Sequence, residues 1–482
     1  MQDQASRRTF LKTALAGGGG LFALRTLGKD GPAPAPAPQV RLRVAVIGCG
    51  VKGLSSHIPA VCAERLVALV DPDENQLAKA LQRARESDPA LDASKIRTFS
   101  DYRKLYDAMG KELDAVVIAT PNHQHARPAL QAMQRGIHAY VEKPMAHTVS
   151  EVRALAEAAR RYKVVTQMGQ QGHSGEGCRR LCEYLWGGAI GQVREVHCWS
   201  DRANGGVTGR LPGKPVPAGL DWDSWIGPAP YRDYHDELHP HDWHSWFDFG
   251  NGSLGNMGCH VLDPAYWALK LRHPAAIEVE ELVGGSGERY PMGTRIRWDF
   301  AARGDLAPVR VYWHDGLVRG RLNDAGAVDP KSDCVVRAAQ NRPALVAELE
   351  KKYGRNLGAN GCLYVGDSGY MTTDAYGDGV RILPEEKHRA FQPPPKSLPR
   401  VKGTHQSNFF QACRSGSEAC ANFDYSAPLT EITLLGCLAI RAGVGRRVEW
   451  DGPAMRCANR PELDRYLKAP CRAGWGGEQG VF

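Results

Sequence analysis

The sequence predicts two folded parts: an α/β domain with a parallel sheet, followed by a larger, strand-rich domain that ends in helices. Strand-like and helix-like segments alternate from Val40 to about Tyr162, which is typical of a parallel sheet with crossover helices. Several later segments alternate apolar and polar residues, as half-buried strands do. At 482 residues the chain also exceeds the size of one hydrophobic core, so two domains are expected.

The first strand and its following turn carry the most specific pattern. The run Arg43–Ile47 predicts a buried parallel strand, and Gly48, Gly50 and Gly53 follow it as Gly-x-Gly-x-x-Gly. In a dinucleotide-binding turn, the first glycine permits the tight turn and the second lets the backbone approach the pyrophosphate. The third allows the helix to pack closely on the strand, and the helix N-terminus faces the phosphates. A purely structural glycine turn is the alternative.

A second strand supports the dinucleotide interpretation. Leu66–Val70 is apolar and ends in Asp71, which follows Gly53 at about the 20-residue spacing typical of an acid that binds a ribose diol. A carboxylate there would repel a 2′-phosphate, so the sequence favours NAD over NADP.

Three further strands are predicted in the same domain. Leu113–Thr120 would be the third strand, Ile137–Val141 the fourth and Val164–Gly169 the fifth. A helix is expected from Ala126 to a C-capping Gly136, and another from an N-capping Ser150. Ligands of open α/β sheets gather at the carboxyl ends of strands. We therefore expect the residues that follow these strands, Thr120–His125 and Glu142–Pro144, to converge with the glycine turn and Asp71.

Residues 1–38 are expected to be an export signal and a linker. Ser6–Lys12 matches the twin-arginine pattern, and a short, weakly apolar stretch, Thr13–Leu24, follows it. Gly31–Pro38 is a Pro/Ala spacer. A short basic helix is the alternative. We therefore expect residues 39–165 to form the dinucleotide-binding domain and residues 166–482 to form the substrate-binding domain.

Export to the periplasm would have two consequences. Proteins on the twin-arginine route fold before they cross the membrane, and the thirteen scattered cysteines fit reduced, mostly buried thiols. Outside the cytoplasm no nicotinamide pool is expected, so the protein would carry its dinucleotide along and regenerate it in place. The modest net charge of +8 is spread along the chain and does not predict nucleic-acid binding. No segment of the processed chain is expected to cross a membrane.

The second part shows strand patterns at Gly191–Trp199, Thr294–Phe300 and Val309–Trp313. Residues 201–250 are rich in Trp, His, Pro and Gly, which suits either a sugar-binding surface or the packing of a large loop. A helical pattern runs from Ser407 to Arg441, with an expected break at Asn422–Pro428.

Three motifs together resemble the Gfo/Idh/MocA family of nicotinamide-dependent oxidoreductases. They are Gly48-x-Gly50-x-x-Gly53, Ala119-Thr120-Pro121-Asn122-x-x-His125 and Glu142-Lys143-Pro144, and the resemblance spans residues 41 to about 452. It implies a Rossmann domain and an open, mostly antiparallel sheet whose face covers the nicotinamide, often with dimerisation through the sheet's other face. It also implies that NAD is the cofactor. The residues expected to bind it are Gly48, Gly50, Val51, Lys52, Gly53, Asp71, Thr120, Pro121, Asn122, His125, Glu142 and Lys143.

Lys143 is the first expected catalytic residue. Its ammonium could hydrogen-bond the alcohol being oxidised and stabilise a developing alkoxide. In the Gfo/Idh/MocA family, which this sequence resembles, the lysine of the Glu-Lys-Pro motif has this role. A surface lysine paired with Glu142 is the alternative.

His260 is the second. A helix through Gly255–Asp263 would place Asn256, His260 and Asp263 on one face. The family commonly has Asp-x-x-x-His here, with histidine as the acid–base group, and this chain has Asn256 in place of the aspartate. The amide can bind a sugar but is no base, so Lys143 and His260 would handle the proton while Asp263 could orient His260. A buried structural histidine is the alternative.

The histidine-rich stretch from His235 to His244 also allows a metal interpretation. Its spacing matches no recognised metal site, so we favour Trp243 and His244 as sugar-facing residues and expect no metal.

These observations lead to three functional hypotheses. The first is an exported, NAD-dependent oxidoreductase of a sugar, glycoside or cyclitol hydroxyl, with tightly held cofactor. The second is a glycosidase that oxidises C3 transiently and recycles NAD in place. The third is a non-catalytic sugar-binding relative, which an intact Lys143 and His260 disfavour.

Overall fold

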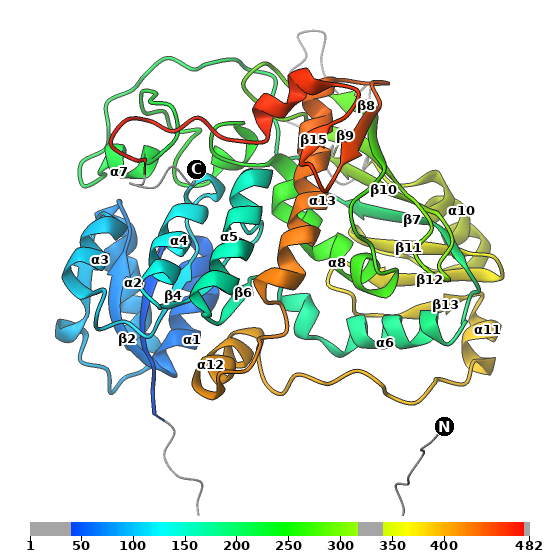
Figure 1. The fold of residues 1–482 in the computed structure, drawn as a ribbon, viewed down its shortest axis with the longest axis horizontal. Coiled ribbons are helices and arrows are strands. Elements are labelled where there is room, and N and C mark those ends of the chain that lie inside the picture. The colour runs from blue at the N-terminus through cyan, green and yellow to red at the C-terminus, as the bar shows by residue number, and fades with distance from the viewer. Residues whose placement is uncertain (1–39, 317–340, 477–482) are drawn as a thin grey trace, which may run out of the picture. The chain divides into compact units, whose positions relative to one another are not determined.

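The computed structural model describes residues 40–316 and 341–476, and these include two sheets within one compact unit that begins at Arg41 (Figure 1). The export signal and linker predicted for residues 1–38 lie outside the described residues. No described helix is both long and apolar enough to cross a bilayer.

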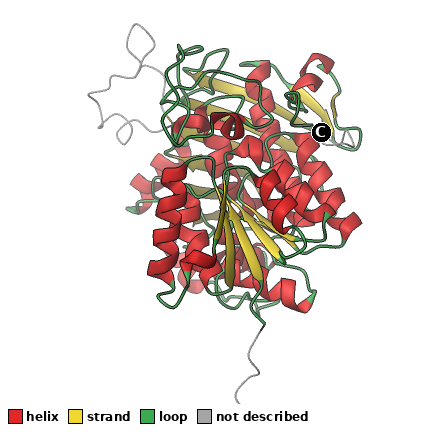
Figure 2. Cartoon of the chain, turned by 90° about the vertical axis from the view of Figure 1, so that its left-hand side faces the viewer, coloured by secondary structure: helices red, strands yellow, loops and turns green. Residues whose placement is uncertain are grey.

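The first sheet confirms the parallel α/β prediction. Its six described strands are all parallel, in the order β3-β2-β1-β4-β5-β6, the order of a doubly wound dinucleotide-binding fold (Figure 2). The strands are β1 (Arg43–Ile47), β2 (Arg65–Val70), β3 (Arg97–Phe99), β4 (Ala115–Ile118), β5 (His138–Val141) and β6 (Thr166–Met168). The short β3 has two exposed residues and no apolar alternation, so the sequence did not predict it. Because β6 belongs to this sheet, the domain continues past the expected limit at residue 165.

Both faces of this sheet are buried, which explains its continuous apolar strands. Val44 and Val46 point to one face and Ala45 and Ile47 to the other, as the two-residue period of a strand requires. The helices are α1 (Ile58–Cys62), α2 (Glu74–Ser87), α3 (Tyr102–Met109), α4 (Ala126–Gln134) and α5 (Val149–Tyr162). Helix α12 (His405–Ser415) returns from the far end of the chain, and its Phe409 and Phe410 complete the α1/α2 face.

The expected start of α5 needs a correction. Thr148, not Ser150, is the N-cap: its hydroxyl accepts from the Glu151 amide while the Glu151 carboxylate accepts from the Thr148 amide at 3.0 Å. This is a capping box, whose Thr-x-x-Glu signature was present in the sequence. Gly136 lies just past α4 at φ +74°, so the expected helix-ending glycine is confirmed.

The second sheet confirms the mostly antiparallel domain. Nine described strands lie in the order β13-β12-β11-β7-β10-β9-β8-β14-β15, with only β7 and β10 parallel. They are β7 (Val193–Ser200), β8 (Ala276–Val283), β9 (Gly293–Phe300), β10 (Val309–Gly316), β11 (Gly361–Gly366), β12 (Gly369–Asp374), β13 (Arg381–Leu383), β14 (Val448–Asp451) and β15 (Arg456–Cys457). One face packs on α6 (Glu176–Trp186), α8 (Cys259–Ala268) and α13 (Phe423–Ala442). Helix α10 (Ala344–Tyr353) covers part of the other face, and α11 (Glu385–Ala390) follows β13.

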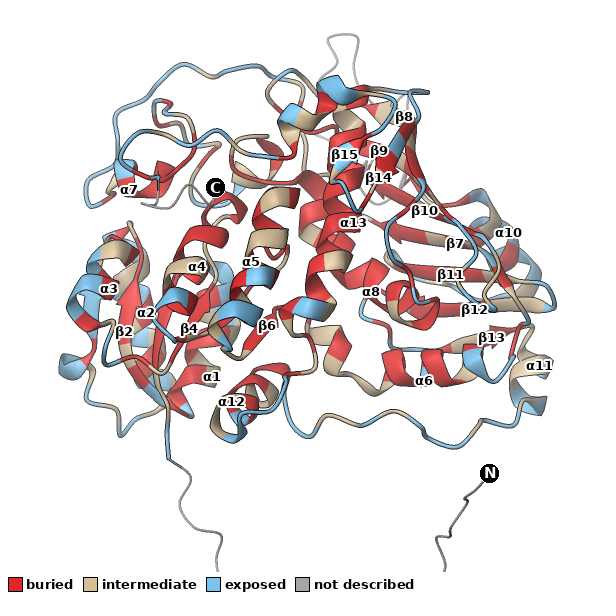
Figure 3. Ribbon diagram, viewed as in Figure 1, coloured by how far each residue is buried: buried red, intermediate tan, exposed pale blue. Residues whose placement is uncertain are grey.

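Helix α13 joins the two domains. It contacts α5 of the first domain as well as α8 and β8 of the second, and most of its length is buried (Figures 1 and 3). The helical stretch is broken as expected, but between Ser415 and Phe423 and not at Asn422–Pro428. Asn422 caps α13 through the Tyr425 amide, and Pro428 lies inside that helix.

Residues 201–250 form a loop-rich segment with its own apolar core. Trp222, Trp225 and Trp246 are buried together with Phe249, so part of the aromatic content serves packing. The segment also contains α7 (Trp222–Ile226) and the short 3₁₀ turn Asp242–Ser245.

Candidate active site

A cleft of about 630 Å³ lies at the carboxyl ends of the first sheet's strands and is closed on its other side by the second domain. It unites nearly all of the predicted site residues. Those lining it are Gly48, Gly50, Val51, Lys52, Asp71, Thr120, Pro121, Asn122, His125, Glu142, Lys143, Trp243, His244, Asn256 and His260. Gly53 and Asp263 are absent from the cleft wall.

The glycine turn fits a dinucleotide. Gly48 has φ +94°, and a Cβ there would lie 2.5 Å from the Ala119 carbonyl carbon. A Cβ on Gly53 would lie 2.5 Å from the Gly48 oxygen, so Gly53 allows the helix to approach the turn without facing the cleft. A Cβ on Gly50 would meet nothing within 4 Å. The three glycines thus divide their roles as predicted, with open space only at the position where a pyrophosphate approaches.

Asp71 lies at the end of β2, in the cleft wall. Its two carboxylate oxygens accept hydrogen bonds from the amides of Cys49 (2.7 Å) and Asp73 (3.0 Å). Burial raises the pKa of Asp71 to about 6, so the carboxylate is ionised above that pH. Each oxygen keeps a further lone pair, which suits a ribose diol as the donor.

Glu142 is a buried carboxylate with a full set of partners. It accepts from Gln171 Nε2 at 3.0 Å and from the Lys143 amide at 3.2 Å, and His57 Nε2 lies 2.9 Å from it. Burial alone would raise the pKa of Glu142, but the hydrogen bond and charge of His57 hold it well below its usual value. Lys143 therefore does not neutralise Glu142, which disfavours the alternative that this lysine is only an ion-pair partner.

Lys143 points across the cleft to the second domain. Its Nζ donates to the Asn256 carbonyl oxygen at 2.7 Å and lies 3.3 Å from Asn256 Oδ1. The Asn256 side-chain nitrogen in turn donates to Asn204 Oδ1 at 2.9 Å. Burial lowers the pKa of Lys143, so the neutral amine is more abundant near neutral pH than for an exposed lysine.

His260, on α8, is a cleft residue from the second domain. It is 4% exposed, and its Nδ1 has no hydrogen-bond partner among the described residues. Burial, with the charge of Lys143, holds the pKa of His260 well below its usual value, so the imidazole is neutral at pH 7. The ring of Tyr376 lies beside it with centroids 4.9 Å apart, and both rings line the cleft.

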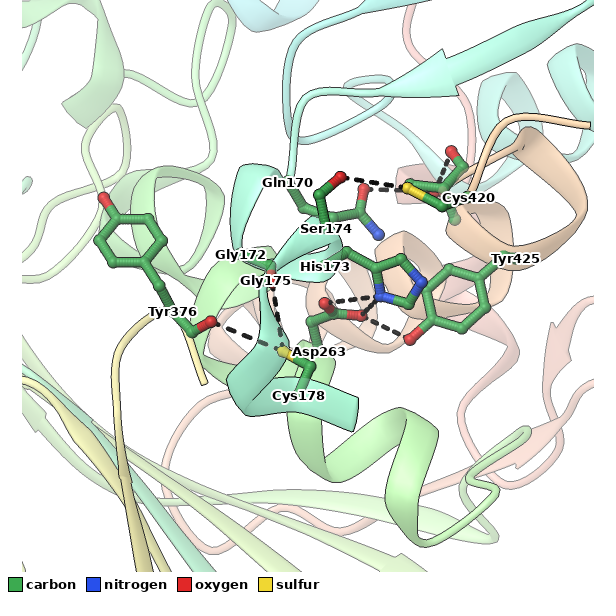
Figure 4. A network of polar contacts seen from close by, with 12 residues as sticks. Gln170, Gly172, His173, Ser174, Gly175, Cys178, Asp263, Tyr376, Cys420 and Tyr425 are labelled. Carbon is green, nitrogen blue, oxygen red and sulfur yellow. Dashed lines mark hydrogen bonds and ion pairs between the residues drawn. The ribbon is translucent and has the colours of Figure 1, made fainter. Parts of the chain in front are cut away.

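Asp263 does not orient His260. Its carboxylate lies 3.0 Å from His173 Nδ1 and accepts from the Tyr425 hydroxyl at 2.5 Å, in a buried cluster (Figure 4). The i, i+3 spacing correctly places both residues on the inner side of α8, but His173 comes from the 3₁₀ turn Gln171–Ser174, which the sequence does not predict to pack there. Gln171 of the same turn holds Glu142, so this turn links the cluster to the cleft.

Trp243 and His244 line the cleft with their rings stacked, 3.7 Å between centroids. The packing hypothesis for residues 201–250 is confirmed for Trp222, Trp225 and Trp246, and sugar binding by Trp243, which lines the cleft, stays a prediction. His239 is committed differently, since its Nε2 lies 3.0 Å from the Asp73 carboxylate at the start of α2. No group of three or more His, Cys, Asp or Glu side chains among the described residues is arranged to hold a metal ion.

His125 lines the cleft but has a bracing role. Its ring nitrogens lie 2.7 Å and 2.8 Å from the carbonyl oxygens of Pro144 and Thr120, which ties the Glu-Lys-Pro turn to the loop after β4. Burial lowers the pKa of His125, whereas the two carbonyl contacts act in the opposite direction.

Arg202, Asn204 and Tyr376 are among the cleft residues that the sequence motifs do not mark. Arg202 and Asn204 lie just after the end of β7, but β7 belongs to the second sheet, in which strand ends point both ways. Tyr376 lies in the turn after β12, and no motif marks it.

Comparison with known proteins agrees with this geometry. Residues 42–170 match the family model described as "Oxidoreductase family, NAD-binding Rossmann fold". Residues 197–284 match the model of that family's C-terminal α/β domain. The first domain is thus an NAD-binding Rossmann domain, and the segment from β7 to β8 belongs to the domain that accompanies it.

Similar individual proteins cover a range of activities. The levoglucosan dehydrogenase of Pseudarthrobacter phenanthrenivorans is 32% identical over 114 residues, 22% of this chain and 29% of its own. A glycosyl hydrolase family 109 protein of Shewanella sp. strain ANA-3 is 35% identical over 118 residues, 24% of this chain and 25% of its own. The matches to the first curated relatives span half of their length or less.

Among solved structures, the aldose-aldose oxidoreductase of Caulobacter crescentus has a TM-score of 0.53 at 17% identity. That match covers 85% of this chain and all of the other, and it shows a shared fold. The two family models lead to one conclusion. Through its NAD-binding domain and the segment from β7 to β8, this chain belongs to the Gfo/Idh/MocA family of oxidoreductases.

Proposed function

We propose that this protein is an exported enzyme that oxidises a ring hydroxyl of a sugar, glycoside or cyclitol with NAD. The observation that carries the proposal is the meeting of Lys143 and His260 in the cleft that the glycine turn also lines. An amine with a lowered pKa and a neutral imidazole would then face the position next to a bound nicotinamide, where a substrate hydroxyl would lie.

The chain's own residues would act as follows. Lys143, with its lowered pKa, takes or shares the proton of the hydroxyl, and its charge then stabilises the developing alkoxide. His260, whose ring lines the cleft, offers an imidazole to bond a sugar hydroxyl or to receive a proton. Trp243 gives the sugar ring an apolar face, and Asn204 and Asn256 offer amides to its hydroxyls. Bound NAD would supply the acceptor for the hydride that leaves the substrate carbon.

A redox-assisted glycosidase is the second candidate. The presence of Lys143 and His260 in one cleft favours it, because one proton-handling group can serve the C3 hydroxyl while the other removes the C2 proton. The C3 ketone acidifies that proton, the aglycone leaves with a proton, and water adds to the double bond before the ketone is reduced again. The sequence match to a family 109 glycosyl hydrolase protein points in the same direction.

Export and tight cofactor binding belong to the same proposal. The twin-arginine pattern in Ser6–Lys12 supports export. Tight binding is supported by the loop-rich segment, which crosses the end of the cleft near Asp71: the Glu74 amide donates to Gly219 O at 2.9 Å, the Asp221 amide donates to Pro72 O at 2.8 Å, and His239 pairs with Asp73.

The test is a reaction without added cofactor. The mature protein is purified, its NAD(H) content is measured, and it is incubated with chromogenic glycosides and free sugars. Aglycone release without added NAD would establish the glycosidase, and a keto sugar formed with stoichiometric NAD would establish the dehydrogenase. Sugar binding without either product would contradict both enzymes. Lys143→Ala should abolish turnover, whereas Lys111→Ala, an exposed lysine outside the cleft, should not.

A further inference from the structure

We infer that the substrate of this site is an acidic sugar, whose carboxylate is bound by Arg202. The inference rests on the proposed function and narrows its substrate class from sugars in general to uronates and glycosiduronates. It starts from Arg202, a cleft residue that takes no part in the proposed proton transfer.

Hydrogen bonds fix the backbone of Arg202, and its guanidinium group is free. Its carbonyl oxygen accepts from Ser253 Oγ at 2.9 Å, and its amide lies 3.3 Å from Ser200 Oγ, which fixes where the side chain leaves the loop after β7. The side chain is 56% exposed. The only carboxylate oxygen within 4 Å of its guanidinium among the described residues is on Asp201, at 3.9 Å from Nε, which is beyond hydrogen-bond range.

Arg202 lies on the substrate side of the cleft. The amide of Asn204, two residues on, donates to the same Ser253 hydroxyl at 2.9 Å, and the Asn204 side chain holds Asn256, which meets Lys143. The pyrophosphate position at Gly50 already has Lys52 beside it. Arg202 is therefore placed for the group that lies near Lys143 and the two asparagines.

The carboxylates of the cleft wall are all committed elsewhere. Asp71 lies at the end of β2, where the ribose diol of the cofactor is expected, Asp101 caps α3 and pairs with Arg103, and Glu142 pairs with His57. The substrate side thus presents cations, imidazoles, amides and aromatic rings from the described residues, with no carboxylate available to accept from sugar hydroxyls. This donor-rich lining matches a ligand that brings its own negative charge.

A carboxylate fits better than a phosphate. The planar guanidinium of Arg202 can bind both oxygens of one carboxylate, and a single arginine balances a single charge. A phosphate near −2 would call for a second cation, and Lys143 is needed for the hydroxyl.

The experiment compares sugars that differ only at C6. Binding and turnover are measured for the 4-nitrophenyl β-D-glucoside and β-D-glucuronide, for the corresponding galactose pair, and for glucose 6-phosphate. We expect the uronides to be favoured at least about tenfold in kcat/KM, as the loss of one charge-assisted hydrogen bond would predict. The preference should shrink in 0.5 M NaCl, because the arginine is exposed.

Arg202→Gln should remove most of this preference, and Arg202→Lys should retain part of it. The control is Arg210→Gln, which makes the same charge change in the same loop outside the cleft and should keep the preference. A preference for neutral sugars, a ratio unchanged by Arg202→Gln, or a stronger effect with the phosphate would overturn the inference.

Failure of the proposed function would look different. If no sugar is turned over, binding is still measured from the change in the protein's tryptophan fluorescence, to which Trp243 in the cleft contributes, using free glucuronate against glucose. Tighter binding of glucuronate that depends on Arg202 would support the acidic ligand without any catalysis, and equal binding would contradict it.

Discussion

Position 256 carries an amide where the Gfo/Idh/MocA pattern commonly has a carboxylate. Asn256 Oδ1 lies 3.3 Å from Lys143 Nζ, and the neutral amide leaves the lowered pKa of Lys143 in place. Asn256→Asp should raise the pKa of Lys143 by about 1–3 units, because an adjacent negative charge favours the ammonium. The acid limb of the kcat/KM profile against pH should therefore move to higher pH.

The control for this charge effect is Asn256→Ala, which removes the amide without adding a charge. It should weaken substrate binding but leave the acid limb near its original pH. An unmoved limb in Asn256→Asp would show that Lys143 is not the group that titrates in catalysis.

Asp71 gives a second prediction at the level of one residue. Asp71→Ala should weaken NAD binding roughly tenfold and reduce the preference for NAD over NADP, because the diol loses its acceptor and a 2′-phosphate is no longer repelled. With a pKa of about 6, the wild-type carboxyl is protonated as the pH falls below 6, so NAD affinity should drop there. Calorimetric titrations with both cofactors between pH 5 and 8 would measure this, and the variant should lose the pH dependence. Unchanged selectivity in Asp71→Ala would contradict the assignment.

Among single elements, the start of α5 gives a prediction, because the sequence predicts Ser150 as the N-cap and the structure shows Thr148 in that role. Thr148→Ala should lower the free energy of unfolding by about 1 kcal/mol, because the Glu151 amide loses its acceptor at the helix N-terminus. Ser150→Ala should change it far less, since Ser150 is not the cap. Urea denaturation of both variants measures the difference, and equal losses would contradict the capping box.

The strand ends show why most of the site was predictable. Apolar composition predicts the strands that precede most of the site residues, and the parallel sheet brings the ends of those strands together. The residues concerned are Gly48–Gly53, Asp71, Thr120–His125 and Glu142–Lys143. Arg202 also follows a strand, but β7 belongs to a sheet in which strand ends point both ways, so the same rule had less force.

Other parts depended on tertiary contacts that no local pattern encodes. Asp263 shares a helix face with His260, yet its partners His173 and Tyr425 arrive from distant segments. Tyr376 reaches the cleft from a turn after β12. In the fold, β3 was missed because two of its three residues are exposed.

For the molecule as a whole, the contacts of the loop-rich segment with the start of α2 give a prediction about cofactor release. His239→Ala should speed the release of NAD several-fold, because it removes the buried pairing with Asp73 that holds the segment across the end of the cleft. The measurement is the loss of bound NAD after rapid dilution. His235→Ala in the same segment, outside the cleft wall, is the matched control. Identical release rates would show that the segment does not retain the cofactor.

The return of α12 to the first domain has a consequence for synthesis. Phe409 and Phe410 complete one face of the NAD-binding sheet, and Arg414 pairs with Glu64 there. A ribosome must therefore make more than four hundred residues before the domain it began with can close. Until then the face of the sheet formed by Val46, Val117 and Tyr140 lacks part of its cover, and chaperones would bind its exposed apolar side chains. We therefore predict that a truncation before residue 405 aggregates more readily than the full chain, because that face of the NAD-binding sheet stays partly uncovered.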